Sequence, residues 1–340
     1  MKIIEVKHRW PENKLRIEIM LGNTCNYKCW YCFPGSNEGT HRWPEYDLFV
    51  KNLEHLLNYY IKNLDKKTFE LHIIGGEPTM WPEFGRFIQH FKDNFDCIFS
   101  MSSNGSRTLR WWEQYGKYMD KVILSCHHES VDVDHFIKVA DCLYDQRVII
   151  TGLVLMDPNH WDKCMDLVKR LKKSQRRWGI DIQEIYHSTI NYNEEQKEIL
   201  KKHRLRQANP FWFLINNKHT LLKTSVVTED GSKINVKNNE IILKKINNFY
   251  GWDCNLGIDS LFIDKNGNLT GACGNNLYNL DFQYNIRDKD FIENFKPALR
   301  STTCSKLSCW CQPESNLTKK IIQSSSPSSE VYLLHKYTNL

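Results

Sequence analysis

The stretch LRIEIMLGNTCNYKCWYC (residues 15–32) joins an apolar run to a loop that contains three cysteines. The run LRIEIML predicts a β-strand, and the cysteines follow at its carboxyl end. In parallel α/β folds and barrels, functional groups gather at this end of the strands. The stretch therefore predicts both a core strand and the place of its chemistry.

The segment that follows alternates short apolar runs with amphipathic helices up to about residue 190. Strands are predicted at 68–74, 97–105, 121–128, 147–156 and 180–187, and helices at 47–64, 82–95, 133–146 and 161–178. Strands that alternate with helices at this spacing indicate βαβ units and a parallel sheet, either open or closed into a barrel. The predicted fold class is α/β.

The second half of the chain interrupts this rhythm. Residues 191–250 mix a basic helix with a hairpin around TEDGSK (228–233), and a second hairpin in SLFIDKNGNLTGAC (260–273) turns at Asn266-Gly267. We expect a core barrel at 14–190, a connecting insert at 191–250 as a candidate substrate cover, a cysteine-rich domain at 251–315 and a mobile tail at 316–340.

Composition narrows the class of protein. The chain has 340 residues, of which 41% are hydrophobic, which is enough for a sizeable core. No run approaches the roughly 20 apolar residues of a membrane span, and the N-terminus lacks the apolar region of a secretory signal. We therefore expect a cytoplasmic protein without a membrane partner. The net charge of +6 comes with basic helical faces but no nucleic-acid-binding motif, so no nucleic-acid partner is expected.

Twelve cysteines are unevenly spaced along the chain. A reducing compartment argues against structural disulfides, and clustering near both ends favours metal binding. Four cysteines lie singly in apolar or helical contexts and are expected to act as small core residues: Cys97, Cys126, Cys142 and Cys164.

The first cluster is Cys25-x3-Cys29-x2-Cys32. Three thiolates can hold three irons of a cubane cluster and leave the fourth iron open to a small molecule, whereas other iron–sulfur sites use four protein ligands. The alternative is a zinc site that adds a histidine such as His41.

This spacing, with Tyr31 directly before the last cysteine, resembles the radical S-adenosylmethionine (SAM) superfamily. GGEP (75–78) ends the second strand, SSNGS (102–106) the third and ILSCHH (123–128) the fourth, as in that family. The resemblance implies a partial (β/α)6 barrel and a [4Fe–4S] cluster bound by the three cysteines and SAM. It also implies these SAM-contacting residues: Tyr31, Gly75, Gly76, Glu77, Pro78, Ser103, Asn104 and Ser125.

The resemblance implies the chemistry as well. The reduced cluster, supplied by a flavodoxin or ferredoxin-type donor, gives one electron to the sulfonium of SAM. The resulting 5′-deoxyadenosyl radical abstracts a hydrogen atom from the substrate, while the protein supplies binding, geometry and exclusion of water.

The second cysteine cluster contains Cys254, Cys273, Cys304, Cys309 and Cys311. It resembles the twitch module, a short form of the SPASM domain, which implies a second, auxiliary [4Fe–4S] cluster. We expect ligation by Cys254, Cys273 and two of the other three. A structural zinc ribbon is the alternative.

Three function classes follow from these patterns. The leading one is an enzyme that acts on a small polar or nucleotide-like molecule. The second is an enzyme that modifies a ribosomally made peptide, and the third is a non-catalytic iron–sulfur or zinc module for redox sensing or nucleic-acid binding. Acid–base or substrate candidates at strand ends are His127, His128, Glu184 and Tyr186. Because His127 and His128 are adjacent, at most one is expected to point inward.

Overall fold

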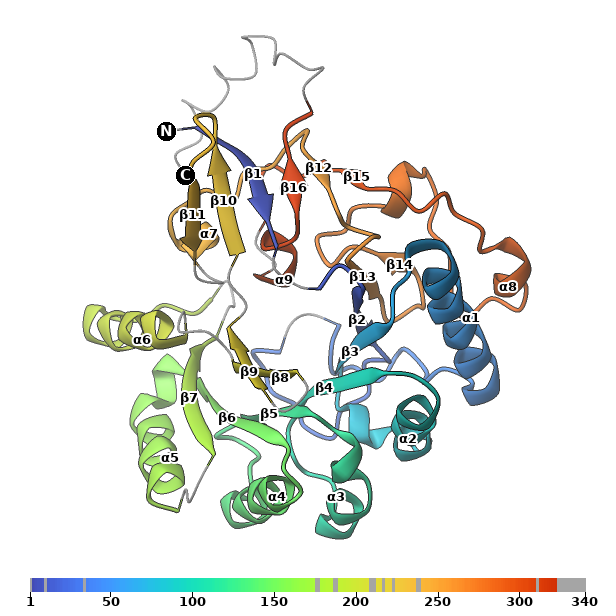
Figure 1. Ribbon diagram of the computed structural model, residues 1–340. Helices are drawn as coiled ribbons and strands as arrows, with labels where there is room; N and C mark the ends of the chain where they lie inside the picture. Colours follow the sequence, from blue (N-terminus) through green and yellow to red (C-terminus); the bar gives the residue numbers. More distant parts are fainter. Residues whose placement is uncertain are drawn as a thin grey trace.

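The structure is a computed structural model, and it describes residues 2–8, 11–32, 35–174, 178–185, 189–207, 212–215, 218–221, 224–236, 240–309 and 312–322. Its centre is an eight-stranded sheet in the order β14-β13-β2-β3-β4-β5-β6-β7. The strands from β2 to β7 are all parallel: β2 (Lys14–Met20), β3 (Thr68–Ile74), β4 (Cys97–Ser103), β5 (Lys121–Cys126), β6 (Ile149–Met156) and β7 (Gly179–Glu184). The sheet curves into a partial barrel, with helices along its outer side (Figure 1). The predicted α/β fold is confirmed.

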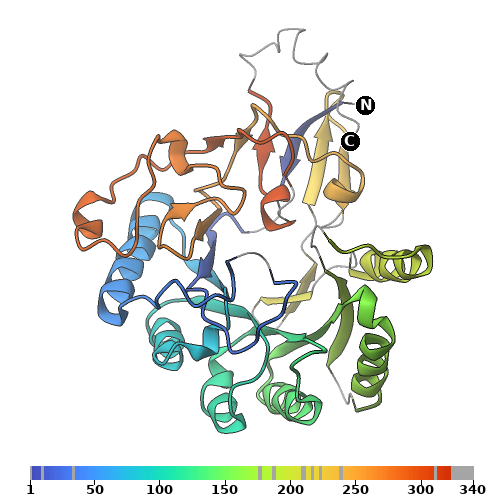
Figure 2. The same cartoon turned by 180° about the vertical axis from the view of Figure 1, so that it is seen from behind.

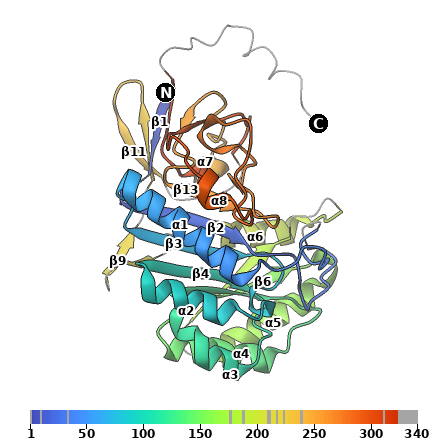
Figure 3. The ribbon, with the colours of Figure 1, turned by 90° about the vertical axis from the view of Figure 1, so that its right-hand side faces the viewer.

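The helices follow the strands as the sequence predicts. They are α1 (Tyr46–Leu64), α2 (Phe84–Asn94), α3 (Leu109–Tyr115), α4 (Val133–Asp145), α5 (Trp161–Ser174) and α6 (Glu194–Gln207). Glu45 caps α1 by accepting hydrogen bonds from the backbone N–H groups of Asp47 and Leu48. Figure 3 shows α1, α2 and α3 stacked beside the strands.

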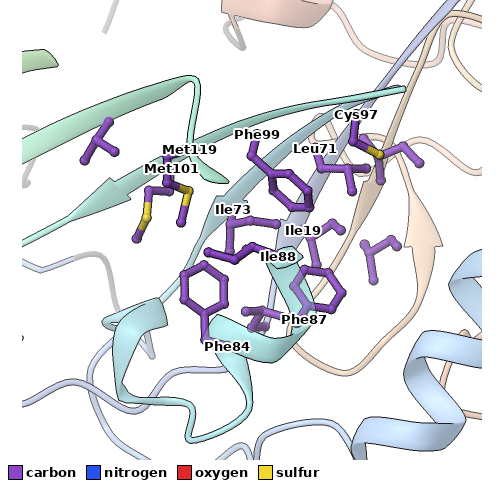
Figure 4. Close-up of a cluster of buried hydrophobic side chains, with 14 of the residues drawn as sticks. Ile19, Leu71, Ile73, Phe84, Phe87, Ile88, Cys97, Phe99, Met101 and Met119 are labelled. Carbon is purple, nitrogen blue, oxygen red and sulfur yellow. The ribbon is translucent and has the colours of Figure 1, made fainter. Parts of the chain in front are cut away.

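Alternate residues of each strand face the helices and form the main core. Figure 4 shows Leu71 and Ile73 of β3 and Phe99 and Met101 of β4 facing Phe84, Phe87 and Ile88 at α2. These side chains are fully buried, and the burial of each one stabilises the fold by roughly 1.5–3 kcal/mol. The intervening residues therefore point into the barrel.

The barrel interior holds a buried ion-pair network. Lys14 Nζ lies 2.5 Å from Glu70 Oε2, and Arg16 Nε lies 3.7 Å from Glu70 Oε1. Arg16 and Glu70 face each other directly in the β2–β3 register. Burial opposes ionisation of Glu70, but Lys14 and Arg16 outweigh it and lower the pKa of this carboxyl to about 2.

We expect Glu70→Gln to lower the free energy of unfolding by about 3–5 kcal/mol, because it removes the negative charge beside the buried Lys14 and Arg16. Since the folded-state pKa lies below the unfolded value, this stabilisation is present above about pH 4.5 and is lost as the pH falls towards 2. Urea unfolding at pH 7 and at lower pH measures both effects. Glu229→Gln, which breaks the exposed pair with Lys2, is the control and should cost about 1 kcal/mol or less. Equal losses in the two variants would contradict the prediction.

The C-terminal segment contributes to two sheets. β13 (Ser260–Ile263) pairs in parallel with β2 and antiparallel with β14 (Leu269–Thr270), which extends the barrel sheet. β12 (Asp253–Cys254) and β15 (Thr302–Thr303) belong to a six-stranded sheet in the order β11-β10-β1-β16-β12-β15. Figures 1 and 2 show this second sheet at one side of the barrel.

Two strands of the second sheet differ from the sequence prediction. β1 (Ile3–Lys7) precedes the strand predicted as the first, and β16 (Lys319–Lys320) lies within the segment predicted as a mobile tail. β16 pairs with both β1 and β12, and Leu317 and Lys319 are buried. Residues 316–322 are thus part of the structure because distant strands supply their partners, and residues 323–340 lie outside the described part.

The predicted hairpins are both present. β10 (Thr224–Thr228) and β11 (Lys233–Val236) flank a turn at Asp230-Gly231, and Asn266-Gly267 connects β13 to β14. The shorter strands and α-helices are β8 (Trp212–Ile215), β9 (Lys218–Leu221), α7 (Glu240–Leu243), α8 (Phe291–Asn294) and α9 (Gln312–Ser315), and short 3-10 helices lie at Pro78–Met80, Gly116–Tyr118, Pro158–His160 and Leu277–Asn279. In the described residues, every helix is too short or too polar to cross a membrane.

Candidate active site

A cavity of about 740 Å³ opens at the carboxyl ends of β2 to β7. Twelve of the residues singled out in the sequence line it: Cys25, Cys29, Tyr31, Cys32, Gly75, Gly76, Glu77, Ser103, Asn104, Ser125, His127 and Glu184. Pro78 is buried beside it at the start of a short 3-10 helix. The volume lies within the range of small-molecule and cofactor sites.

The cysteine loop follows β2 and is held by its own polar groups. The backbone N–H of Cys32 donates to the carbonyl of Cys29, and Asn37 Nδ2 donates to the same carbonyl at 3.2 Å. Burial raises the pKa of the Cys25 thiol, and it raises the pKa of Cys29 to about 11 although Tyr31 opposes it. A bound cation reverses such shifts, since it stabilises thiolates directly. Three thiols on one loop of this cavity therefore fit an iron–sulfur cluster.

The two glycines of GGEP allow the end of β3 to pack against the cysteine loop. Gly75 has φ +91° and Gly76 has φ +51°, and a Cβ on Gly76 would collide with the backbone of Thr24. The N–H of Glu77 donates to the carbonyl of Thr24 at 2.8 Å. The sequence predicted close approach to a ligand, and the structure adds a close approach to the residue before Cys25.

Glu77 connects the ends of β3 and β4. Its carboxylate is 1% exposed and accepts hydrogen bonds from Thr79 Oγ1 at 2.6 Å, Ser103 Oγ at 2.8 Å and the Asn104 N–H at 2.7 Å. Burial raises the pKa of Glu77, and these hydrogen bonds oppose the rise. The carboxylate thus positions two other cavity residues, Ser103 and Asn104. Its contact with SAM stays a prediction.

The two adjacent histidines separate as expected for neighbours after a strand. His127 lines the cavity, where its Nδ1 lies 3.1 Å from Tyr31 Oη and 3.4 Å from Cys29 Sγ. Burial, and then His128, lower the pKa of His127 to about 4, so this imidazole is neutral at pH 7. His128 does not line the cavity, and its Nε2 lies 3.7 Å from Asp157 Oδ2. Tyr186 lies outside the described residues.

Sequence reasoning missed one wall of the cavity. The β13–β14 hairpin contributes Phe262, Asp264, Lys265, Asn266 and Ala272, and β7 adds Gln183. Lys265 Nζ donates to the carbonyl of Gly35 in the cysteine loop at 3.3 Å, across 230 residues of sequence. The hairpin itself was predictable from Asn266-Gly267, but its place beside β2 depends on a long-range strand pair.

Four C-terminal cysteines are described, and each is buried or partly buried. Cys254 ends β12, Cys304 follows the neighbouring strand β15, and the N–H of Cys309 donates to the carbonyl of Asn247. Burial raises the pKa of Cys309 to about 12; Lys319 opposes this, and Glu314, Cys254 and Cys304 add to it. Such mutual influence indicates neighbouring thiols. Glu314 accepts hydrogen bonds from the N–H groups of Ala272 and Cys273. Cys311 lies outside the described residues.

Comparisons with known proteins agree with this geometry. Residues 19–174 match the model of the Radical SAM superfamily. The radical SAM cyclopropyl synthase TigE of Paramaledivibacter caminithermalis is 32% identical over 123 residues, which cover 32% of this chain and 26% of that protein. The match thus spans about a quarter of the length of this relative.

Two similar solved structures share the fold. They are anSMEcpe with bound AdoMet and native anSMEcpe with bound AdoMet and a Cp18Cys peptide, each with a TM-score of 0.50 and 17% identity. Each comparison covers 83% of this chain and 80% of the other. Residues 19–174 therefore form a radical SAM domain, and the cofactors of that superfamily are a [4Fe–4S] cluster and SAM.

Proposed function

We propose that Cys25, Cys29 and Cys32 hold the [4Fe–4S] cluster and that the adjoining cavity binds SAM. The observation that carries this proposal is one cavity lined by all three cysteines together with the other predicted cofactor residues Gly75, Gly76, Glu77, Ser103, Asn104 and Ser125. The cluster and SAM together supply the one-electron chemistry that starts hydrogen-atom abstraction from a substrate.

In this proposal, the residues of the chain bind and orient the cofactors and exclude water from the site. Gly75 and Gly76 bring the backbone of β3 to the cysteine loop, and Glu77 holds Ser103 and Asn104 at the cavity wall. Asn104 Nδ2 also donates to Asn26 Oδ1 at 3.0 Å, between the first two cysteines of the loop. These hydrogen bonds fix the cavity wall, so the cofactor site is preorganised before the substrate binds.

A second, auxiliary [4Fe–4S] cluster is proposed at the C-terminal cysteines. Cys254, Cys273, Cys304 and Cys309 are the described ligand candidates, with Cys311 as the fifth thiol of this group. Ala272 lines the active-site cavity and directly precedes Cys273. A cluster at these thiols would therefore adjoin the cavity, where it can accept an electron or contact substrate.

The favoured substrate is a small polar or nucleotide-like molecule. Support comes from the cavity lining beyond the cysteine loop, where Gln183, Glu184, Asp264, Lys265 and Asn266 offer amide and charged groups. A few convergent polar groups in a cavity are what fixes the orientation of a small ligand.

Peptide modification is the second candidate. One of the similar structures contains a bound peptide together with AdoMet, which motivates testing this class here. Stimulation of SAM turnover by peptides encoded beside the gene, but not by the low-molecular-mass fraction of cell extract, would favour it over the small-molecule proposal.

The primary test is formation of 5′-deoxyadenosine. Anaerobically reconstituted protein with SAM and dithionite, which replaces the proposed flavodoxin or ferredoxin-type donor, should release it. A cluster spectrum without 5′-deoxyadenosine would instead support the non-catalytic iron–sulfur alternative, and zinc at the N-terminal cysteines would reject the cofactor assignment.

We expect His127→Phe to lower the midpoint potential of the N-terminal cluster by tens of millivolts, because hydrogen bonds to cluster sulfurs tune the potential and Nδ1 lies 3.4 Å from Cys29 Sγ. An EPR-monitored redox titration measures the shift. His135→Phe is the control, because that ring contacts the carbonyl of Arg107 rather than a cysteine. An unchanged potential in His127→Phe would show that His127 only fills space.

A further inference from the structure

Three metal-ligating side chains meet behind the cavity wall, at the ends of β5 and β6. His128 follows β5, Asp157 follows β6, and His160 lies one turn further along, in the 3-10 helix Pro158–His160. One donor atom from each side chain lies within 4.8 Å of the other two. It is the one such group of three found among the described residues.

The separations suit a single ion. His160 Nδ1 lies 3.0 Å from Asp157 Oδ2, and His128 Nε2 lies 3.7 Å from the same oxygen. A tetrahedral ion with bonds of about 2.0–2.1 Å places its donor atoms roughly 3.3 Å apart. The two observed distances bracket that value, so small side-chain movements would complete the coordination.

One ring nitrogen of His128 is buried without a hydrogen-bond partner. Its side chain is 1% exposed, and its Nδ1 is buried without a hydrogen bond. At 3.7 Å, Nε2 is too far from Asp157 Oδ2 for a direct hydrogen bond. Buried polar groups are nearly always satisfied in folded proteins, and a metal ion bound at a ring nitrogen is one way to satisfy a buried imidazole.

The charge and access of the site also suit a cation. Asp157 is fully buried and supplies a carboxylate to the site. The nearby Glu129 and Lys163 act on His128 with charges of opposite sign. His160 has a side chain that is 54% exposed, so an ion could enter from solvent and keep an open position on that side.

We propose that His128, Asp157 and His160 bind one divalent first-row transition metal ion of the zinc type. Two imidazoles and one carboxylate are a donor set typical of such ions, and neither thiol cluster takes part in it. The ion would join the end of β5 to the end of β6 through the segment that leads into α5. His128 also stacks on Tyr31, with ring centroids 6.3 Å apart, so the ion would stiffen the wall behind a cavity residue.

Zinc loading of the full-length, anaerobically reconstituted protein tests this proposal. After incubation with Zn²⁺ and desalting, native protein should retain one more zinc per chain than His160→Ala. X-ray absorption at the zinc edge should show nitrogen and oxygen neighbours at about 2.0–2.1 Å, rather than sulfur at about 2.3 Å. The affinity for zinc should fall at least about tenfold in His160→Ala. Iron content is measured in parallel and should not change.

Matched variants separate the metal site from a simple histidine–carboxylate contact. His90→Ala removes a partly exposed histidine that pairs with Glu54 at 2.8 Å, and it should retain native zinc binding. Asp157→Asn keeps the oxygen that accepts from the Asn159 N–H but removes the charge, and it should lose zinc as His160→Ala does. Equal zinc in native protein and His160→Ala, a sulfur-only shell, or no retained zinc would each overturn the proposal.

Discussion

Replacing Cys25, Cys29 and Cys32 together by Ala should remove about four irons per chain and abolish 5′-deoxyadenosine formation. The three thiols line one cavity and stand on a single loop, so the variant removes every proposed protein ligand of the N-terminal cluster. Iron and sulfide analysis of anaerobically reconstituted protein, with product analysis by chromatography, measures both effects. Iron that remains after this change reports the proposed auxiliary cluster.

Cys142→Ala is the matched control for this variant. Cys142 is also a partly buried free thiol, but it lies on α4, where Gln146 Nε2 lies 3.6 Å from its sulfur. The control should keep native iron content and activity. If the triple variant retained native iron and still released 5′-deoxyadenosine, the proposed ligands would be wrong.

Replacing Gly76 by Ala should abolish SAM turnover or reduce it by orders of magnitude. The residue has φ +51°, and the added Cβ would collide with the carbonyl and nitrogen of Thr24, which are backbone atoms next to Cys25. The loop that carries the cysteines would have to move, and displacements of about 1 Å at a reacting site can cost on the order of 10²-fold in rate. The rate of SAM turnover is measured together with the affinity for SAM, which is obtained by calorimetry.

Gly231→Ala separates this collision from the strain of a positive φ. Gly231 has φ +80° in the β10–β11 turn, and a Cβ added there would meet no atom of another segment within 4 Å. This variant should lose about 1 kcal/mol of stability and no activity. Equal activity losses in the two variants would show that backbone strain, rather than contact with the cysteine loop, is responsible.

Much of the site was predictable because its signals are local. The spacing of Cys25, Cys29 and Cys32 is a property of one loop, and GGEP lies directly at the end of an apolar run. The hydrophobic periodicities of strands and of helices can also be recognised in short windows of sequence. The order of β2 to β7, and the cavity at their carboxyl ends, follow from these repeating units.

Contacts between distant segments were not predictable in this way. The pairing of β13 with β2 brings Asp264 and Lys265 into the cavity, and the pairing of β16 with β1 and β12 orders residues expected in a tail. Which strand edge accepts a partner depends on backbone hydrogen bonds and on packing across the whole molecule, and neither leaves a periodic signal in the partner. That only one of His127 and His128 lines the cavity could be anticipated from alternation, but the meeting of His128 with Asp157 and His160 required the three-dimensional positions of β5 and β6.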